Sequence, residues 1–333
     1  MNKCKLSVVI IGKNEEQFIA KAIASVLEAT KTLAAEVIYV DSASTDRSIE
    51  EAQKFPIRIL QLKPDWHLSV AAGRYTGSLN STGEYIFFLD GDAEADKDWL
   101  VKAVEFMDNS PEYGACAGVL DEVYMTDDGE VVGGQDNVFG QDLDADVSDM
   151  KALGGLALYR TAAFDKVGLV NPYLPTGEDD ELCMRIRNAG YKVARIKGRM
   201  AVKYTEKRES LHEVFRRCRT KMYDYGAVIR YSALYGGGTQ YTLEMIPYVA
   251  SFVVATIIAA VAIPFMIVNG QLVVLLVAAG LALGYMFYKK RSVNGVLISL
   301  AVRAVSTYRT VVSFLGTRTK AVTTYPTDAI QVQ

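Results

Sequence analysis

The feature that most constrains this chain is an uncharged apolar run of about 23 residues, Ile246–Val268. As a helix, a run of that length is long enough to cross a bilayer. A turn at Asn269-Gly270 and a second apolar run, Leu272–Tyr288, come next. A hairpin buried in a water-soluble core is the alternative, but uncharged runs this long are rare in such folds. We therefore predict two transmembrane helices, at about 246–268 and 272–288, within a membrane region spanning 241–291.

Positive charge directly follows the predicted hairpin. Lys289-Lys290-Arg291 lie in the cytoplasm by the positive-inside rule. Because the outer loop is short, the N-terminal part is expected on the same side. The apolar run Leu6–Ile11 is too short for a signal-peptide core. We predict a multi-pass protein of the cell membrane with a cytoplasmic N-terminal domain.

The region 292–333 contains another apolar stretch, Val293–Leu315, which is interrupted by Arg303 and Arg309. As a third span it would place two arginines in mid-membrane, which is costly. We favour an amphipathic helix in the interface or packed on the hairpin, followed by a C-terminal tail. A third membrane helix is the alternative.

Before residue 241, short apolar runs alternate with helical patterns. The predicted strands are Leu6–Ile11, Val37–Val40, Arg58–Leu62, Tyr85–Leu89 and Ala115–Val119. The predicted helices are Glu16–Leu27, Ser48–Phe55, Val70–Ser81 and Asp98–Asn109. This βαβα alternation predicts an α/β domain with a mostly parallel, Rossmann-like sheet covered by helices on both faces. Such sheets bind ligands at the carboxyl ends of their strands.

Composition excludes several classes of function. The 333 residues are 50% hydrophobic and 23% charged, so a sizeable core forms, and the net charge of -3 argues against a general nucleic-acid binder. Four scattered cysteines, with no CxxC pair, make a zinc site or a disulfide framework improbable and fit a reduced cytosol. Two histidines almost exclude a histidine-based triad.

Charge is unevenly distributed along the chain. Residues 195–230 hold eleven Lys/Arg against four Asp/Glu, and apolar residues at helical spacing predict one amphipathic helix over about 212–229. We predict a basic juxtamembrane segment at 206–240 whose Arg216 and Arg219 contact phosphates or the acceptor; a solvated helical face is the alternative. Residues 121–150 hold ten acidic residues and no basic one, which predicts a solvated, mobile excursion or a role in acceptor recognition.

Asp90-Gly91-Asp92 directly follow the strand Tyr85–Leu89. Two carboxylates at the carboxyl end of a strand, with a glycine between them, can approach a divalent cation and a diphosphate together. Mg²⁺ and Mn²⁺ prefer oxygen ligands and are often shared with substrate phosphates. Turns also contain this pattern, but its place after an apolar strand favours a metal and phosphate site.

Two further acidic segments are candidates. Four acids, Glu178 to Glu181, follow Gly177 and precede a helical pattern that ends at Gly190. Acidic residues are common at a helix N-terminus, which is the alternative explanation. Four in a row, however, repel one another, and such clusters mark sites of shifted pKa. One of these carboxylates could accept a proton from an attacking hydroxyl.

Asp41, after the strand Val37–Val40, is the other candidate. It either begins a turn capped by Thr45 or Asp46 or holds a base or ribose.

Together these segments resemble the family 2 glycosyltransferases. The ordered set is Leu6-Ser-Val-Val-Ile-Ile-Gly-Lys-Asn14-Glu15-Glu16, Val40-Asp41-Ser-Ala-Ser-Thr-Asp46, Gly73-Arg74, Gly83-Glu84-Tyr85, Asp90-Gly-Asp92, Gly154-Gly155, Gly177-Glu-Asp179-Asp-Glu-Leu and Arg185-Ile-Arg187-Asn-Ala-Gly190-Tyr191. Each motif alone is weak, and their order makes the resemblance specific. It covers roughly residues 5–205, within a predicted catalytic domain at 1–205.

The resemblance implies a GT-A fold, a nucleoside-diphosphate sugar donor, a divalent cation (Mg²⁺ or Mn²⁺) and inversion at the anomeric carbon. It implies that Asp179 is the general base, supported by Glu178. The metal role falls to Asp92 with Asp90, and Gly154 and Gly155 are candidates for acceptor or phosphate contacts. The implied nucleotide-binding residues are Asn14, Glu15, Asp41, Arg74 and Asp90. Where many relatives carry a histidine this chain has Lys203-Tyr204, which puts a third protein ligand for the metal in doubt.

A hairpin beside a cytosolic site suggests a membrane-associated acceptor. Because a base-like acidic cluster is present, a hydroxyl of a lipid-linked glycan is favoured, as in cell-surface polysaccharide or glycoconjugate biosynthesis. A polyprenyl phosphate, which needs no base, is the alternative. A processive synthase is disfavoured because a QxxRW-like segment is missing. A non-catalytic, membrane-tethered nucleotide-sugar binding protein and a transporter are the rivals from other classes.

Overall fold

The protein is described from a computed structural model, which covers residues 4–126, 128–206 and 210–333. The chain divides into two compact units. The first comprises residues 1–207 and 320–333, and the second comprises residues 208–319. Each unit has its own architecture and is considered separately below.

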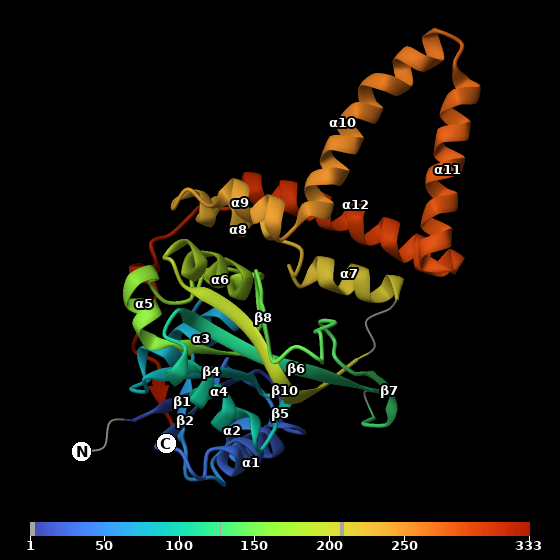
Figure 1. The fold of residues 1–333 in the computed structure, drawn as a ribbon. Helices are drawn as coiled ribbons and strands as arrows, with labels where there is room; N and C mark the ends of the chain where they lie inside the picture. Colours follow the sequence, from blue (N-terminus) through green and yellow to red (C-terminus); the bar gives the residue numbers. More distant parts are fainter. Residues whose placement is uncertain (1–3, 127, 207–209) are drawn as a thin grey trace. The chain divides into compact units, whose positions relative to one another are not determined.

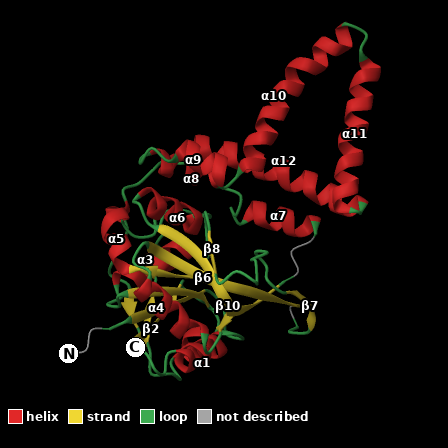
Figure 2. Cartoon of the chain, viewed as in Figure 1, coloured by secondary structure: helices red, strands yellow, loops and turns green. Residues whose placement is uncertain are grey.

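The first unit is built around one mixed sheet (Figures 1 and 2). Its described strands are β1 (Leu6–Gly12), β2 (Ala35–Asp41), β3 (Arg58–Gln61), β4 (Tyr85–Asp90), β5 (Ala93–Ala95), β6 (Tyr113–Met125), β7 (Val131–Gln135), β8 (Val147–Asp149), β9 (Ala157–Arg160), β10 (Lys192–Thr205) and β11 (Ile330–Gln331). The strand order is β11-β3-β2-β1-β4-β9-β6-β10-β5, with β7 beside β6 and β8 beside β10. Strands β3, β2, β1 and β4 are parallel, whereas β9 runs antiparallel between β4 and β6.

Helices accompany the sheet in the order that the alternating pattern predicts. They are α1 (Ile19–Ala29), α2 (Ser48–Ala52), α3 (Val70–Leu79), α4 (Trp99–Asn109), α5 (Thr161–Val167) and α6 (Glu178–Asn188), with a 3-10 turn at Val322–Thr324. In α1 the buried positions Ile19, Ala22, Ile23 and Val26 recur at helical spacing, which explains why this segment is a helix that packs on one face. The predicted α/β fold is confirmed.

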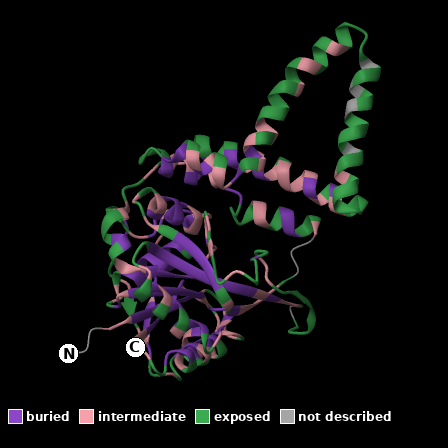
Figure 3. Ribbon diagram, viewed as in Figure 1, coloured by how far each residue is buried: buried purple, intermediate pink, exposed green. Residues whose placement is uncertain are grey.

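The core of the first unit lies in the parallel strands. In β4 the run from Tyr85 to Leu89 is buried on both faces, as expected for a strand covered on each side (Figure 3). Helix α3 packs closely on β1, because Gly77 presents no side chain to Val9 there. These contacts fix the carboxyl ends of β1 and β4, where the site described below is found.

One prediction for the first unit is wrong in part. The acidic stretch 121–150 is not a simple excursion, because it continues β6 and contributes β7 and β8 to the sheet. The C-terminal tail, for which the sequence predicted no contacts, also joins this sheet. Ile330 and Gln331 pair antiparallel with β3, and the Tyr325 hydroxyl donates to the His67 carbonyl at 2.8 Å. Backbone pairing of this kind joins distant segments, so local patterns did not reveal it.

The second unit consists of helices. They are α7 (Leu211–Arg219), α8 (Tyr225–Ala233), α9 (Gly238–Glu244), α10 (Pro247–Val268), α11 (Leu272–Lys290) and α12 (Val293–Gly316). The single amphipathic helix predicted over about 212–229 is wrong, because the chain forms α7 and α8 with a break between them. Lys221 in that break has a φ of 63°, a left-handed conformation that an α-helix does not contain.

The predicted apolar hairpin corresponds to α10 and α11. Among the described residues, α10 and α12 are the helices long and apolar enough, by length and composition, to cross a membrane. α12 therefore meets the criterion for the third span that the sequence left open. Asp224 accepts two hydrogen bonds from Arg309 of α12, at 2.8 and 2.7 Å, which offsets part of the cost of placing this arginine in an apolar helix.

Candidate active site

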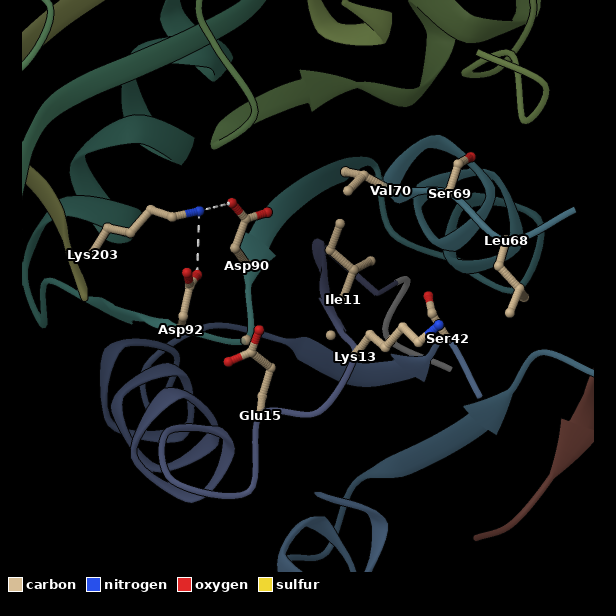
Figure 4. Close-up of a pocket in the computed structure, with 12 residues that line it drawn as sticks. Ile11, Lys13, Glu15, Ser42, Leu68, Ser69, Val70, Asp90, Asp92 and Lys203 are labelled. Carbon is tan, nitrogen blue, oxygen red and sulfur yellow. Dashed lines mark hydrogen bonds and ion pairs between the residues drawn. The ribbon is translucent and has the colours of Figure 1, made fainter. Parts of the chain in front are cut away.

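A cavity of about 350 Å³ opens at the carboxyl ends of β1 and β4 (Figure 4). The two strands are parallel and Ile11 pairs with Asp90, so the residues that follow each strand converge at one edge of the sheet. The polar side chains that line the cavity are Lys13, Glu15, Ser42, Ser69, Asp90, Asp92 and Lys203. Sequence segments nearly 190 residues apart therefore meet here, and the cavity carries both signs of charge.

Asp90 lies between two cations. Its Oδ1 accepts from Arg74 Nη2 at 3.0 Å, and its Oδ2 accepts from Lys203 Nζ at 2.5 Å. Burial alone would raise the pKa of Asp90, but Lys203 and Arg74 lower it to about 2. Asp90 is therefore ionised at neutral pH, with both oxygens engaged by the protein.

Asp92 shares Lys203 with Asp90, since Lys203 Nζ lies 3.2 Å from Asp92 Oδ1. Burial and the neighbouring Asp90 raise the pKa of Asp92. Glu15 lies beside them, and burial together with Asp92 raises its pKa to about 8. Gly91 allows this approach, because a Cβ there would lie 3.2 Å from Glu15 Cγ. The sequence pattern with glycine between two aspartates thus reflects close packing as well as chemistry.

Arg74 links the two acidic motifs of the sequence. Only 3% of this residue is exposed, and besides Asp90 it pairs with Glu178 at the start of α6. Gly155 leaves room for it, since a Cβ at that position would lie 2.5 Å from Arg74 Nη2. The predicted site residues Asp90 and Glu178 are therefore brought together through one buried guanidinium.

The three acids that open α6 differ in environment. Burial, against the effect of Arg74, raises the pKa of Glu178 to about 7. Burial and the two neighbouring carboxylates raise the pKa of Asp180 to about 8. Asp179 between them is half-buried. Glu178 is thus held in an ion pair with Arg74, and Asp179 follows it in the first turn of α6.

Several predicted residues have structural partners instead of facing the cavity. Asp41 is fully buried, and its oxygens accept from Tyr39, from the Ser44 backbone and from Gln61. Asn14 adopts a φ of 59° and its Oδ1 accepts from the backbone of Thr45. Both hold the loops after β1 and β2 in place. Ser42, which follows Asp41, lines the cavity.

The remaining predicted residues lie apart from this cavity. Gly154 has a φ of 79° and shapes the turn before β9, so its role in the structure is conformational. Arg216 and Arg219 belong to α7 in the second unit, where Arg216 pairs with Glu213 at 2.6 Å. Their predicted contact with phosphate or acceptor stays a prediction.

The site contains features that the sequence did not reveal. Lys203 was noted only as a replacement for a histidine, but it bridges both aspartates of the motif. Lys13 and Ser69 were not predicted as lining residues at all. Ser69 precedes α3, where its hydroxyl caps the helix by accepting from the Ala72 backbone. A serine directly before a helical pattern was the available sequence signal for Ser69.

The carboxylates of this cavity are of the type that divalent cations prefer. Among the described residues no group of three or more His, Cys, Asp or Glu side chains could hold a metal ion. Magnesium, however, is often bound by one or two carboxylates together with substrate phosphates. Asp92 Oδ1 is buried and lies 3.2 Å from Lys203 Nζ without a hydrogen bond of regular geometry. Both oxygens of Asp90 accept hydrogen bonds from Arg74 and Lys203, so Asp92 is the less firmly engaged of the two carboxylates.

Comparison with known proteins agrees with the resemblance. Residues 7–168 match the family described as Glycosyl transferase family 2. An uncharacterized glycosyltransferase of Haemophilus influenzae is 27% identical over 139 residues, which are 40% of this chain and 42% of that protein. An uncharacterized glycosyltransferase of Rickettsia conorii is 37% identical over 110 residues, 32% of this chain and 36% of that protein. The chain thus covers less than half the length of either relative, and the acidic turn at Glu178 lies beyond the family match.

Two solved structures of S. aureus TarS are also similar. The crystal structure of TarS 1–349 in complex with UDP-GlcNAc matches 65% of this chain and 64% of that chain, with 18% identity and a TM-score of 0.49. The crystal structure of TarS matches 65% of this chain and 39% of that chain, with 18% identity and a TM-score of 0.46. The mixed sheet and the family match at residues 7–168 together confirm the expected GT-A fold. Residues 7–168, just under half of the chain, thus form a glycosyl transferase family 2 domain.

Proposed function

We propose that this protein is an inverting, metal-dependent glycosyltransferase that moves a sugar from a nucleoside-diphosphate sugar to a hydroxyl of a membrane-associated, lipid-linked glycan. The observation that carries the proposal is the chain of charges formed by Asp92, Lys203, Asp90, Arg74 and Glu178. It connects a cavity at the ligand-binding edge of the sheet with the acidic turn of α6. A donor diphosphate and a proton acceptor would meet across such a chain.

Lys203 supplies the charge that a diphosphate requires. Burial alone would lower its pKa, but Asp90 and Asp92 hold the pKa of Lys203 above its usual range, so the ammonium stays charged. A fixed cation next to a leaving diphosphate stabilises the negative charge that develops as the bond to the sugar breaks. Lys13, which is exposed at the mouth of the cavity, adds a second ammonium for the donor.

Asp92 would hold the divalent cation, which neutralises charge on the leaving diphosphate when it is bound. Arg74 keeps Asp90 and Glu178 in fixed positions, whereas Asp92 is contacted by Lys203 at 3.2 Å without a hydrogen bond of regular geometry. We expect a chelator to abolish transfer and added Mn²⁺ or Mg²⁺ to restore it.

Asp179 would act as the general base. It takes the proton of the acceptor hydroxyl while that oxygen forms a bond to the anomeric carbon, and the bond from that carbon to the diphosphate breaks with its electron pair leaving on the diphosphate oxygen. The attack and the departure occur on opposite faces of the sugar, which inverts the anomeric centre. Glu178, held by Arg74, supports the turn that carries Asp179.

The decisive experiment measures nucleoside-diphosphate release by the full-length protein. UDP-, GDP- and dTDP-sugars are supplied with Mn²⁺ or Mg²⁺, with and without chelator and with and without a polar lipid extract. We expect metal-dependent release from one donor and a faster rate with lipid. Absence of release from every donor in the presence of lipid would favour a non-catalytic, membrane-tethered nucleotide-sugar binding protein.

A substitution separates the two kinds of acceptor. Asp179→Asn keeps the size of the side chain but removes the base, so transfer to a hydroxyl should fall by about 10²–10⁴-fold while donor affinity is retained. Asp165→Asn, at an exposed position of α5, is the matched control and should transfer normally. Near-normal transfer by Asp179→Asn would instead favour a polyprenyl phosphate acceptor, whose oxygen is already ionised.

We further propose that α10 and α11 span the membrane and that the first unit is cytoplasmic. Support comes from the length of both helices and from Lys289-Lys290-Arg291 at the end of α11. A cysteine placed at Asn269, in the turn between the helices, should react with an impermeant maleimide in intact cells. Lys290→Cys should react only after the cells are permeabilised, and the wild-type chain reports the background from its four native cysteines. Equal labelling of both variants in intact cells would contradict this orientation.

A further inference from the structure

The two arginines of the apolar helix α12 have different partners. Arg309 is paired with Asp224 through two hydrogen bonds. Arg303 donates to Ser299, to its carbonyl oxygen at 3.2 Å and to its hydroxyl. Among the residues that the structure describes, no carboxylate lies within ion-pair distance of Arg303. A half-buried guanidinium in an apolar helix is costly without an anion, so an anionic ligand would stabilise this charge.

A cavity of about 590 Å³ adjoins Arg303 within the second unit. Its lining combines Arg303 and Lys290 with the side chains of Tyr248, Ser292 and Asn294. No aspartate or glutamate is among the described residues that line it. Two cations with hydroxyl and amide donors and no opposing carboxylate fit an anion with several acceptor oxygens.

The position of the cavity indicates which anion. Lys290 ends α11, and Ser292 begins α12, where its hydroxyl accepts from the Gly295 backbone at 2.9 Å. In a membrane protein the charged end of an apolar helix lies at the level of the lipid headgroups. The same cavity is lined by Ile298 and Val302, which provide an apolar surface beside the cations. A ligand with a phosphate and an acyl or isoprenoid chain matches both parts.

We propose that this cavity binds the phosphate group of an anionic membrane lipid, with Arg303 and Lys290 as its ligands. Arginine forms paired hydrogen bonds with phosphate oxygens, and lysine adds a second positive charge. The site is formed by second-unit residues alone, so it does not depend on the activity proposed for the first unit. This site is distinct from Arg216 and Arg219 of α7, for which the sequence predicted contacts with phosphate or acceptor.

The test is native mass spectrometry of the full-length protein in a neutral detergent, titrated with phosphatidylglycerol or phosphatidylcholine. We expect phosphatidylglycerol to bind with at least about tenfold higher affinity, since a hydrogen-bonded charge pair contributes about that much. Arg303→Gln should lower the affinity for phosphatidylglycerol about tenfold or more, and Lys290→Gln should lower it less. Lys290 is exposed, so its substitution does not put the fold at risk.

Lys289→Gln is the matched control, because it removes the same charge one residue away and outside the lining of the cavity. We expect it to bind phosphatidylglycerol as the wild type does. Equal losses in Arg303→Gln and Lys289→Gln, or equal binding of the two lipids, would overturn the proposal. Millimolar inorganic phosphate distinguishes the sources: competition supports recognition of the phosphate group itself, and a loss in Arg303→Gln without competition supports the intact lipid.

Discussion

The two units of this chain place polar and apolar side chains in opposite ways. In the first unit Val8, Ile10 and Phe87 are completely buried within the sheet. In the second unit α10 exposes Val261 and Phe265, and the residues that α12 buries include Ser306. Burial of apolar surface away from water stabilises the first arrangement. In the membrane that we propose for the second unit, that driving force is absent between helices, and close packing of small residues would take its place.

The two units also differ in how they bury arginine side chains. The first unit buries Arg74 in contact with two carboxylates beside a cavity, and the second pairs Arg309 with Asp224 inside its helices. Arg74 therefore links two acidic residues of the candidate active site, whereas the pair at Arg309 holds α8 against α12. From this difference we expect the stability of the first unit to depend most on its buried charges. The stability of the second unit should depend most on close packing of its helices.

Arg74→Met tests whether buried charge stabilises the first unit, and it has the largest expected effect. It leaves Asp90 and Glu178 buried without their shared cation, which should lower the free energy of unfolding by about 3–5 kcal/mol. Nucleoside-diphosphate release should fall by about 10³-fold or more, because both acidic motifs lose their anchor. Both tryptophans, Trp66 and Trp99, lie in the first unit, so their fluorescence during urea unfolding reports on this unit.

Arg47→Met is the control for Arg74→Met. Arg47 is 69% exposed and pairs with Glu16 at 3.5 Å, so its loss should change stability by less than about 1 kcal/mol. If both variants unfolded at the same urea concentration as the wild type, the buried network would not be what holds the first unit together.

Gly226→Leu tests whether close packing of helices stabilises the second unit. A side chain at Gly226 of α8 would collide with the Thr310 carbonyl and the Phe314 backbone of α12. Overpacking of this kind should destabilise the second unit by about 1–3 kcal/mol. We expect the loss of helical circular dichroism on heating to begin at a lower temperature, while tryptophan fluorescence of the first unit melts as in the wild type.

Gly280→Leu in α11 is the matched control, since nothing lies within 4 Å of a Cβ at Gly280. It should leave both melting curves unchanged. A simultaneous shift of the fluorescence and helical signals in Gly226→Leu would mean that the two units unfold together, and the contrast between them would then not extend to their stability.

The comparison also explains what the sequence could predict. The strands and helices of the first unit were predicted because each has its own periodicity, and Asp90 and Asp92 lie at the end of a buried strand, as the apolar run before them indicates. The bridge from Arg74 to Glu178 spans 104 residues, and no local pattern encodes it. For the same reason the sequence did not reveal that Tyr39 and Gln61 hold Asp41, whose contact with a base or ribose stays a prediction.

The smallest expected effect concerns Asp180 and the pH dependence of the first unit. Its pKa is raised from the usual 3.8 to about 8, because it is partly buried and lies beside Asp179 and Glu178. Between these two pH values the folded chain holds a proton that the unfolded chain releases. The free energy of unfolding should therefore fall as the pH rises from about 4 to about 8. Asp180→Asn mimics the protonated form, so it should match the wild type near pH 4 and exceed it by about 1–3 kcal/mol near pH 8.

Urea unfolding followed by tryptophan fluorescence at the two pH values measures this difference, with the exposed Asp165→Asn as a control that keeps the slope of the wild type. The outcome also bears on which carboxylate acts as the proposed base. A protonated Asp180 leaves Asp179 as the carboxylate able to accept a proton from a hydroxyl, since Glu178 is held by Arg74. If Asp180→Asn kept the pH slope of the wild type, Asp180 would be ionised at neutral pH. It would then compete with Asp179 for the role of base, and transfer by Asp180→Asn would have to be measured beside Asp179→Asn to separate them.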